Sequence, residues 1–289
     1  MSSPLFRFIL YADDSTLCCS FPRADCENVH TVINEGLSDV HGWLLSNRLA
    51  INTDKTKYII FSYRGTVDVS PIRFGGDIIQ QVDSVKFLGM HIDQNLTFSR
   101  HIDYVSSKIS KTIGMIYRLN SFFPSYILRT LYFSLIHPYF IYGSVVYLNT
   151  ANYLVQKLVL LQKKAIRAVY GLNYRDHTTV YFHQSKILKL QDLHKFNTCL
   201  YFYRVLNHNF DSSLLSDLNR HANVHSHNTR YNSNMLVPLY SHSKSQNCIT
   251  YVGSKFWNGL TDDIRASNSI HIFKNKLKQM LISSYSPDS

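Results

Sequence analysis

The chain has 289 residues, of which 45% are hydrophobic and 17% are charged, a composition typical of a folded protein with one large domain or two ordinary ones. No apolar run reaches the roughly 18 residues of a membrane-spanning helix, and we find no secretion signal. Five cysteines without CxxC spacing argue against a disulfide framework and against a zinc knuckle. The sequence therefore predicts an intracellular protein, nuclear or cytoplasmic, with no membrane partner.

The net charge of +11 is unevenly distributed along the chain. Residues 1–115 contain 11 Lys and Arg against 12 Asp and Glu, whereas residues 116–289 contain 19 against 7. A strongly basic field favours a polyanion such as nucleic acid, although solubility or attraction to anionic lipid would also explain it. Because the basic residues are spread over expected helices with interleaved aromatics, we favour nucleic acid.

Near the start of the chain, an apolar run ends in two adjacent carboxylates, and a second run rich in Thr, Leu and Cys follows. Residues 8–19 therefore predict a strand, a tight turn and a strand, with Asp13 and Asp14 at the tip. Because both flanks are apolar, we expect the hairpin to be buried in a sheet with its charges at one end. The two carboxylates suit a hard divalent cation of the kind that assists phosphoryl transfer. The alternative is ordinary turn chemistry, since Asp tolerates the turn backbone.

Several further elements are expected before residue 98. An apolar stripe predicts a helix over residues 29–44. Residues 52–57 form a polar turn, in which Lys55 is either a solvated turn residue or a phosphate contact, and residues 58–61 form a buried strand. Gly75-Gly76 predicts a two-residue hairpin, and residues 85–92 predict one strand in which Gly89 marks a bulge or a close backbone approach. Phe98 ends this sheet region.

From residue 99 the pattern becomes helical. Apolar residues at steps of three and four predict a helix over residues 102–116, with Lys108 and Lys111 on the opposite face. Further helices are expected to start at Pro124, to run over residues 154–168 and stop at Gly171, and to cover residues 193–203.

The carboxyl-terminal part begins with a less regular stretch, residues 208–251, for which we expect a mobile loop. His221, His225 and His227 suggest a metal cluster, but no Cys or carboxylate stands at ligand spacing beside them. Ser269 is expected to cap a final helix. Its inward residues are Ile270, Phe273, Leu277 and Met280.

Taken in this order, the motifs resemble those of the reverse transcriptases of non-LTR retrotransposons of the jockey and CR1 kind. Residues 8–14 are similar to the palm hairpin of that family, residues 43–56 to its W…N…L…N…KT stretch, and residues 87–93 to its primer-grip strand. Residues 101–102, 138–143 and 162–167 resemble its thumb and connection helices. Residues 187–190, 228–230 and 253–258 resemble its carboxyl-terminal region, so the resemblance covers nearly the whole chain.

The resemblance implies an α+β fold. A partial antiparallel palm sheet with a packed helix is expected over residues 1–98, a helical thumb and connection over residues 99–207, and a carboxyl-terminal helical and irregular region over residues 208–289. It further implies an RNA-directed DNA polymerase, a nucleotidyltransferase that uses Mg²⁺ and acts on an RNA/DNA template–primer.

Carried over residue by residue, the resemblance makes Asp13 the catalytic metal ligand and Asp14 its less demanding neighbour. Tyr11 is expected to pack beside the primer terminus. Lys55 is expected near the triphosphate, as a candidate proton donor to the leaving pyrophosphate. The remaining nucleic-acid contacts are Phe87, Leu88 and Gly89 on the primer strand and the backbone-tracking residues Lys108, Lys111, Lys163, Lys164 and Arg167.

Parts of the family pattern have no counterpart in this sequence. These are the strand with the other metal-binding aspartate, the fingers, a Gly-Pro-Gln-Gly-like segment and the endonuclease, since Met1 falls just before the palm hairpin. A loss of positioning worth several kcal/mol lowers a rate by roughly thousands-fold. We therefore expect weak or absent Mg²⁺ binding, no activity of this chain alone, and a partner that supplies the amino-terminal palm and fingers.

Three hypotheses remain at this point. The first is a fragment of a reverse transcriptase, active only if the other part exists elsewhere. The second is a nucleic-acid-binding module without catalysis. The third is a reading frame that yields no stable protein, because the palm strands lack partners.

Overall fold

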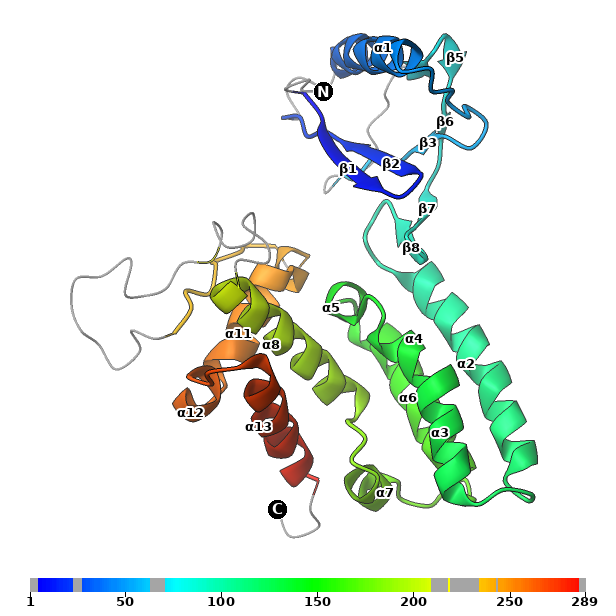
Figure 1. Ribbon diagram of the computed structural model, residues 1–289, viewed down its shortest axis with the longest axis vertical. Coiled ribbons are helices and arrows are strands. Elements are labelled where there is room, and N and C mark those ends of the chain that lie inside the picture. Colours follow the sequence, from blue (N-terminus) through cyan, green and yellow to red (C-terminus); the bar gives the residue numbers. More distant parts are fainter. Residues whose placement is uncertain are drawn as a thin grey trace, which may run out of the picture. The chain divides into compact units, whose positions relative to one another are not determined.

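The computed structural model of the chain describes residues 5–22, 28–62, 71–208, 218, 234–242 and 244–285. The chain divides into two compact units, Met1–Thr97 and Phe98–Ser289 (Figure 1). In the described ranges, the first unit contains short strands and one helix, and the second contains helices. This arrangement confirms the predicted α+β class. The finer division into three regions stays a prediction.

The predicted hairpin at the start of the chain is present. Strand β1 (Arg7–Tyr11) pairs with β2 (Asp14–Cys18) in antiparallel fashion, and the register brings Tyr11 opposite Asp14. Ala12 and Asp13 therefore form the two-residue turn, in which Ala12 adopts a left-handed φ of 50°.

The predicted burial of this hairpin is wrong. Ile9, Leu10 and Tyr11 are 40%, 67% and 64% exposed. In the described part of the chain β1 and β2 pair only with each other, so no further strand extends the sheet. Only residues away from the tip, Phe6, Phe8 and Leu17, reach the core of the first unit.

Helix α1 (Val29–Ser46) supplies half of the buried residues of that core. Its buried side chains Val29, Ile33, Leu37 and Val40 follow the helical repeat, which confirms the predicted helix. Buried residues from the following segments complete the cluster: Ile72, Phe74 and Ile79. Gly36 faces Phe6 so closely that a Cβ would lie 2.8 Å from its ring, so this glycine makes room for the helix–strand contact.

Two more pairs of very short strands lie in the same unit. Strand β3 (Lys57–Tyr58) pairs in parallel with β6 (Gln80–Gln81), and β4 (Arg73–Phe74) pairs in antiparallel fashion with β5 (Asp77–Ile78). The Gly75-Gly76 turn is confirmed, with φ of +63° and +94°. The predicted buried strand over residues 58–61 is wrong in extent, since it ends at Tyr58 and Phe61 is 51% exposed.

The predicted single strand over residues 85–92 is instead a hairpin. Strand β7 (Ser84–Phe87) pairs with β8 (Met90–Asp93), and Phe87 lies opposite Met90. Leu88 and Gly89 form the turn with φ of 44° and 83°. Gly89 thus reverses the chain instead of marking a bulge, because its positive φ is the one that a two-residue turn needs.

The second unit begins with a group of packed helices. Its elements are α2 (Ser99–Leu119), α3 (Ser125–Leu135), α4 (His137–Ile141), α5 (Ser144–Tyr147), α6 (Asn152–Tyr170) and α7 (Thr179–Gln184). Helices α2, α3 and α6 pack side by side (Figure 1). Pro124 is the N-cap residue of α3, and Gly171 ends α6 with φ of +64°, as the sequence predicted.

The remaining helices form the carboxyl-terminal part of this unit. They are α8 (Leu190–His208), the short 3₁₀ helix η2 (Ser245–Asn247), α11 (Ile249–Asn258), α12 (Asp262–Arg265) and α13 (Ile270–Ser283). Helix α8 packs against both α11 and α13. Phe273 stacks on Tyr203 and on Trp257, with ring centroids 4.5 and 5.9 Å apart. The aromatic residues of three helices thus share one core.

The cap of α13 is as predicted, because the Ser269 hydroxyl accepts a hydrogen bond from the backbone N–H of Ile272 at 3.3 Å. Phe273 and Leu277 are buried, but Met280 is only partly buried and Leu281 takes the inward position. His221, His225 and His227 lie outside the described residues. Within the described ranges, no helix combines the length and the apolar character that crossing a bilayer requires.

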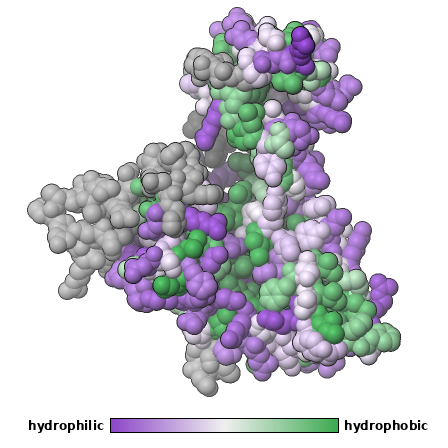
Figure 2. Space-filling view, viewed as in Figure 1, coloured by the Kyte–Doolittle hydropathy of each residue, from purple (hydrophilic) through white to green (hydrophobic). Residues whose placement is uncertain are grey.

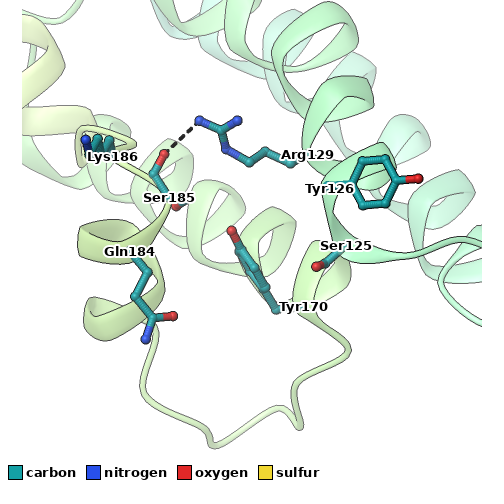
Figure 3. A pocket seen from close by; sticks show the side chains of 7 residues that line it. All are labelled: Ser125, Tyr126, Arg129, Tyr170, Gln184, Ser185 and Lys186. Atoms are coloured by element: carbon teal, nitrogen blue, oxygen red, sulfur yellow. Dashed lines mark hydrogen bonds between the residues drawn. The ribbon is translucent and has the colours of Figure 1, made fainter.

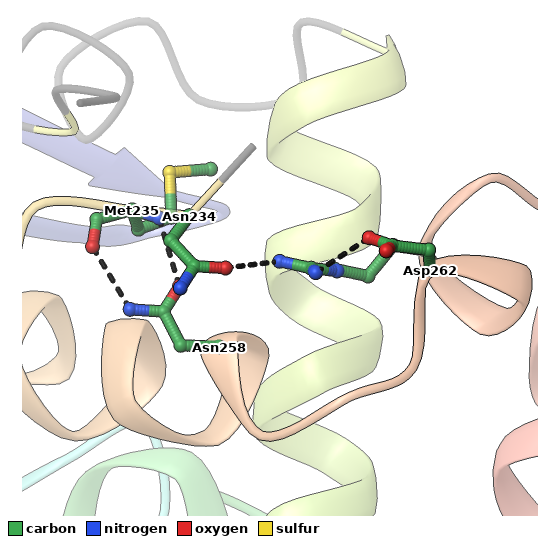
Figure 4. Close-up of polar contacts among 5 residues, drawn as sticks. Asn234, Met235, Asn258 and Asp262 are labelled. Atoms are coloured by element: carbon green, nitrogen blue, oxygen red, sulfur yellow. Dashed lines mark hydrogen bonds and ion pairs between the residues drawn. The ribbon is translucent and has the colours of Figure 1, made fainter. Parts of the chain in front are cut away.

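A polar clamp ties residues 234–235 to the carboxyl-terminal helices (Figure 4). The Asn258 side chain accepts a hydrogen bond from the Met235 N–H at 2.8 Å and donates one to the Met235 carbonyl at 2.9 Å. Arg265 donates to Asn234 and pairs with Asp262.

Gly253 lies against the Phe202 ring, where a Cβ would approach to 2.0 Å. The motif over residues 253–258 is therefore a packing motif of this unit.

Candidate functional site

The two carboxylates predicted as metal ligands lie together at the tip of the first hairpin. Asp13 occupies the turn and Asp14 is the first residue of β2, and both are exposed. Their oxygen atoms are the donors that Mg²⁺ prefers, and Mg²⁺ commonly binds through one or two carboxylates together with water and substrate phosphate. In the described ranges, no group of three His, Cys, Asp or Glu residues is suitably placed for a metal. The pair fits part of a magnesium site.

Tyr11 lies next to the turn and is 64% exposed, so its ring is accessible. The predicted primer-grip residues lie on the other hairpin of the unit, with Phe87 at the end of β7 and Leu88 and Gly89 in its turn. The hairpins β1–β2 and β7–β8 are separate two-stranded sheets. Sequence reasoning missed the second turn, because apolar residues on both sides of Gly89 are also typical of a single buried strand.

Lys55 is presented by a turn that Asn52 organises. The Asn52 side-chain oxygen accepts a hydrogen bond from the Lys55 N–H at 3.1 Å, and its carbonyl accepts one from the Thr56 hydroxyl at 2.8 Å. The nearby Thr53 hydroxyl donates to Asp77 at 2.9 Å. These bonds explain why Asn52 and Thr56 stand at fixed spacing around Lys55, whose side chain is exposed.

A basic stripe runs along α2 of the second unit. Lys108 and Lys111 are exposed, and the Lys108 ammonium lies 5.6 Å from the centre of the Tyr104 ring. Exposed Arg100 and Arg118 follow the same spacing of three and four residues. We call Arg100, Lys108, Lys111 and Arg118 the α2 stripe. Only its two lysines were predicted as nucleic-acid contacts, although the same spacing of three and four residues also includes both arginines.

Helix α6 carries the other predicted backbone contacts. Lys163 and Lys164 are exposed, as a polyanion contact requires. Arg167 is partly buried and donates through Nε and Nη2 to the Asp176 carbonyl at 3.3 and 3.1 Å. Its guanidinium also lies 5.9 Å from the centre of the Tyr174 ring. Arg167 therefore holds the loop after α6 and leaves Tyr174 79% exposed.

Helices α2 and α6 run in the same direction. Lys157 pairs with Asp103 at 3.3 Å near their amino-terminal ends, and the Asn120 side chain donates to the Ala168 carbonyl at 3.0 Å near their carboxyl-terminal ends. The two basic helices are thus fixed to one another within the second unit.

The strongly shifted titratable groups of this unit belong to its core. Burial lowers the pKa of His194 to about 4 and raises the pKa of the Cys199 thiol to about 12. The His194 ring packs edge-on against Phe256, with centroids 5.4 Å apart. Both groups are uncharged at neutral pH, which suits packing and does not suit nucleophilic or acid–base chemistry.

Comparison with known proteins supplies the relatives of this chain. Over 164 residues, or 55% of the chain, it is 27% identical to the RNA-directed DNA polymerase from mobile element jockey of Drosophila melanogaster, covering 18% of that protein. It is 26% identical over 168 residues (57% of the chain, 18% of the relative) to the probable RNA-directed DNA polymerase from transposon BS of the same organism.

A third relative, the probable RNA-directed DNA polymerase from transposon X-element of Drosophila melanogaster, is 23% identical over 217 residues, which cover 73% of the chain and 23% of that protein. The chain thus spans less than a quarter of the curated relatives it matches. No family model and no solved structure matches it. The similarity to non-LTR retrotransposon reverse transcriptases, of the jockey kind, is confirmed.

Proposed function

We propose that this chain, a relative of jockey-type RNA-directed DNA polymerases, is part of such a polymerase and binds its template–primer. The observation that carries the proposal is the exposed Asp13–Asp14 pair at a two-residue turn, in a chain whose relatives are RNA-directed DNA polymerases. A pair of carboxylates at a hairpin tip is accessible to a divalent cation and to phosphate oxygens.

Within this proposal, Asp13 binds Mg²⁺ and Asp14 assists it. Tyr11 packs beside the primer terminus, and the β7–β8 turn with Phe87, Leu88 and Gly89 helps to hold the primer strand. Lys55 approaches the triphosphate. Its exposure on a turn that is fixed by Asn52 supports that role. Mg²⁺ supplies charge stabilisation on the reacting phosphate when it is bound.

The second unit contributes the grip on the nucleic-acid backbone. Two helices that are fixed to each other carry exposed cations. Helix α2 carries the α2 stripe, and α6 carries Lys163 and Lys164. Contacts of this type read charge and not sequence, and they lose affinity as salt rises. We expect Arg167 to act mainly by holding Tyr174, because its guanidinium already bonds to Asp176.

We further propose that the chain does not extend primers by itself. Its matched segments cover 18 to 23% of the relatives, and the described residues bring no third acidic, His or Cys ligand to the Asp13–Asp14 pair. A second candidate function, nucleic-acid binding without catalysis, is favoured by the same incomplete ligand set. The two candidates differ in whether a supplied amino-terminal palm and fingers restores synthesis.

Binding is tested by fluorescence anisotropy with a labelled RNA/DNA template–primer at several salt concentrations. We expect the logarithm of affinity to fall linearly with the logarithm of salt, with no preference among duplex sequences. Lys108→Ala combined with Lys111→Ala should reduce the slope by about 2, whereas Lys244→Ala, at an exposed lysine outside the α2 stripe, should not change it. An affinity that does not respond to salt would contradict the proposal.

Catalysis is tested by primer extension on an RNA template with Mg²⁺. We expect no incorporation by the chain alone, and incorporation when an amino-terminal palm and fingers fragment of a relative is added. Asp13→Ala should abolish the restored activity. Robust extension by the unassisted chain would overturn the claim of inactivity, and failure of every reconstitution would favour the non-catalytic candidate.

A further inference from the structure

The second unit contains a cavity that the proposed template–primer contacts do not use. It has a volume of about 350 Å³ and lies between α3, the end of α6 and the end of α7. It is lined by Ser125, Tyr126, Arg129, Tyr170, Gln184, Ser185 and Lys186 (Figure 3). These side chains bring two cations and several hydroxyl and amide groups, and none of the seven is acidic.

Arg129 is held in a fixed orientation at this cavity. Its Nη2 donates to the Ser185 carbonyl at 2.9 Å (Figure 3), and the guanidinium carbon lies 4.9 Å from the centre of the Phe133 ring. Its Nε is buried and has no hydrogen-bond partner among the described residues. The charge of Arg129 is therefore positioned by protein contacts but is not neutralised by them.

Lys186 stands at a backbone position that favours glycine. Ile187 donates to the Phe182 carbonyl and Lys186 to the His183 carbonyl, which is the Schellman pattern at the end of α7. Lys186 accordingly has a left-handed φ of 52°. A lysine here gains a little from the helix dipole, but α7 has only six residues and the conformation is disfavoured for any residue with a Cβ. Lys186 thus keeps a cation in the lining of the cavity at a position where glycine is the less strained residue.

A third cation approaches from α13. Helix α13, which carries Lys278, packs against α7. Partial burial, and then the charges of Arg129 and Lys186, lower the pKa of the Lys278 ammonium. The ion pairs of the described residues involve Lys157, Arg265 and Lys276, and none involves these three. Three neighbouring positive charges without a carboxylate create a site for an anion.

We propose that this cavity binds a backbone phosphate of a single-stranded nucleic acid, held by Arg129 and Lys186. The charge of Lys278 adds to the positive field. The inference rests on the proposed nucleic-acid function and adds to it a distinct site with its own ligand chemistry. A planar guanidinium and an ammonium group match phosphate oxygens, and the hydroxyls of Ser125 and Tyr170 offer further donors.

Exposed aromatic side chains beside the cavity favour a single strand as the source of the phosphate. Figure 2 shows hydrophobic residues gathered where α2 ends and α3 begins, and Phe122 there is 79% exposed. Tyr126, which lines the cavity, is 70% exposed, and Tyr174 after α6 is 79% exposed. Bases that flank a bound phosphate can stack on such rings, which stabilises unpaired strands and not intact duplexes.

The test uses Lys186→Gly in the full chain. Glycine is the preferred residue at this φ, so the variant should fold at least as well as the parent while it loses the cation. Lys244→Gly is the matched control, because it removes an exposed lysine outside the cavity at the N-cap of η2, where glycine is tolerated. Thermal unfolding of both variants verifies that they are folded.

Binding is measured by fluorescence anisotropy with a labelled single-stranded oligonucleotide of about 12 nucleotides, at salt concentrations from about 50 to 200 mM. We expect Lys186→Gly to weaken binding about three- to tenfold and to reduce the slope of log affinity against log salt by about 0.7, with little change for Lys244→Gly. Inorganic phosphate should raise the melting temperature of the parent chain more than chloride of equal ionic strength, in part because phosphate is excluded from protein surfaces. The increase should be smaller in Lys186→Gly than in Lys244→Gly, because only Lys186→Gly loses the site.

The other outcomes overturn the inference in distinguishable ways. If Lys186→Gly binds the oligonucleotide as the parent does while the Lys108→Ala, Lys111→Ala variant does not, the cavity has no role and the proposed function stands. Equal losses of oligonucleotide affinity in Lys186→Gly and Lys244→Gly would show that binding depends only on the overall positive charge of the chain and not on the cavity. If the parent binds no oligonucleotide, nucleic acid is excluded even where phosphate binds. If the parent chain binds phosphatidylserine vesicles, and Lys186→Gly loses this binding while its oligonucleotide binding is unchanged, the ligand of the cavity is a lipid headgroup.

Discussion

The two units of the chain bury their apolar side chains to different degrees. In the second unit, Ile102, Ile109, Ile116 and Tyr132 are completely buried, and helices contributed by distant parts of the sequence share one core. In the first unit, the core side chains retain between 6 and 9% exposure, and the residues before the Asp13–Asp14 turn are largely exposed. The helical unit thus has a fully buried core of its own, while the apolar residues of the first hairpin near its turn stay exposed.

The charges divide in the same way as the cores. The first unit has 8 Lys and Arg against 11 Asp and Glu and carries the exposed carboxylates, whereas the second has 22 Lys and Arg against 8 Asp and Glu on a helical framework with a fully buried core. A surface that binds the phosphate backbone of a nucleic acid needs cations at fixed separations, and a well-packed helical unit provides them. A catalytic pair needs further ligands and a covered sheet before it is positioned for chemistry. Our proposal therefore assigns phosphate binding to the second unit, separately from the carboxylates of the first.

The largest expected effect contrasts one isoleucine from each unit. Ile109→Ala should lower the free energy of unfolding of the second unit by about 2–5 kcal/mol, because it leaves a cavity among fully buried side chains. Ile9→Ala should change the stability of the first unit by less than about 0.5 kcal/mol, because Ile9 is 40% exposed.

The two tryptophans of the chain allow this contrast to be measured unit by unit. Trp43 lies in α1 and Trp257 in α11, so the Trp43→Phe background leaves a reporter of the second unit alone. Urea unfolding followed by tryptophan fluorescence gives the loss for Ile109→Ala in that background, and Trp257→Phe gives the measurement for Ile9→Ala. Comparable losses at both positions would show that the hairpin is covered in solution.

A second contrast uses pH, because only the second unit has deeply buried histidines among the described residues. Burial lowers the pKa of His137 and His194 from 6.5 to about 4. Between these values the unfolded chain binds protons that the folded unit does not, so stability falls as pH falls from about 6.5 to 4. The loss should approach roughly 2–3 kcal/mol per histidine.

The measurement is urea unfolding of the Trp43→Phe chain at several pH values. His194→Gln and His137→Gln should each flatten the dependence, since glutamine does not titrate in this range. His271→Gln, at an exposed ring of α13, is the control for the substitution itself. A stability that rises as the pH falls from 6.5 to 4 would mean that the two rings are protonated in the folded chain.

A third contrast compares buried and exposed hydrogen bonds. Gln162 in α6 donates to the Leu188 carbonyl at 2.9 Å and to the Tyr132 hydroxyl at 3.2 Å, and it accepts from the Leu190 N–H at 2.8 Å. Gln162→Leu leaves buried backbone groups without partners and should cost about 1–3 kcal/mol. Thr53→Val in the first unit removes the exposed bond to Asp77 and should cost less than about 0.5 kcal/mol.

Chemical denaturation of each variant, followed through the tryptophan of its own unit, gives these values. A loss at Gln162 no larger than the loss at Thr53 would show that solvent reaches the Gln162 side chain when α6 is in place.

The parts of the fold that the sequence predicted well are those with a local cause. Helix α1 and helix α2 each repeat apolar residues at helical spacing because one face of each is buried. Gly75-Gly76 marks a turn because glycine has no Cβ and adopts a positive φ, and Ser269 marks a cap because its own hydroxyl accepts the hydrogen bond. Residue-level chemistry of this kind can be read before any tertiary contact is known.

The failures came where a neighbour decides the outcome. Leu88-Gly89 is a turn because β7 and β8 pair, while the same apolar residues also fit one buried strand. The β1–β2 flanks are apolar but exposed, and their cover depends on what else packs there. The Arg129–Lys186 cavity joins segments that are far apart in sequence. Gln162 lies in a motif that the sequence revealed, but its hydrogen-bond partners Leu188 and Leu190 could be identified only from the fold.

The smallest expected effect is the sharpest test of the division between the units. Asp13→Ala should change the affinity for an RNA/DNA duplex by less than about twofold, because the basic excess that attracts phosphate lies in the second unit, after Thr97. Removing one exposed carboxylate takes away a small repulsion, so any change should be a slight tightening. Anisotropy at fixed salt, with and without Mg²⁺, measures it against the Lys108→Ala, Lys111→Ala variant. If Asp13→Ala weakened binding tenfold only when Mg²⁺ is present, the hairpin would be holding the duplex through the metal, and the grip on nucleic acid would belong to both units.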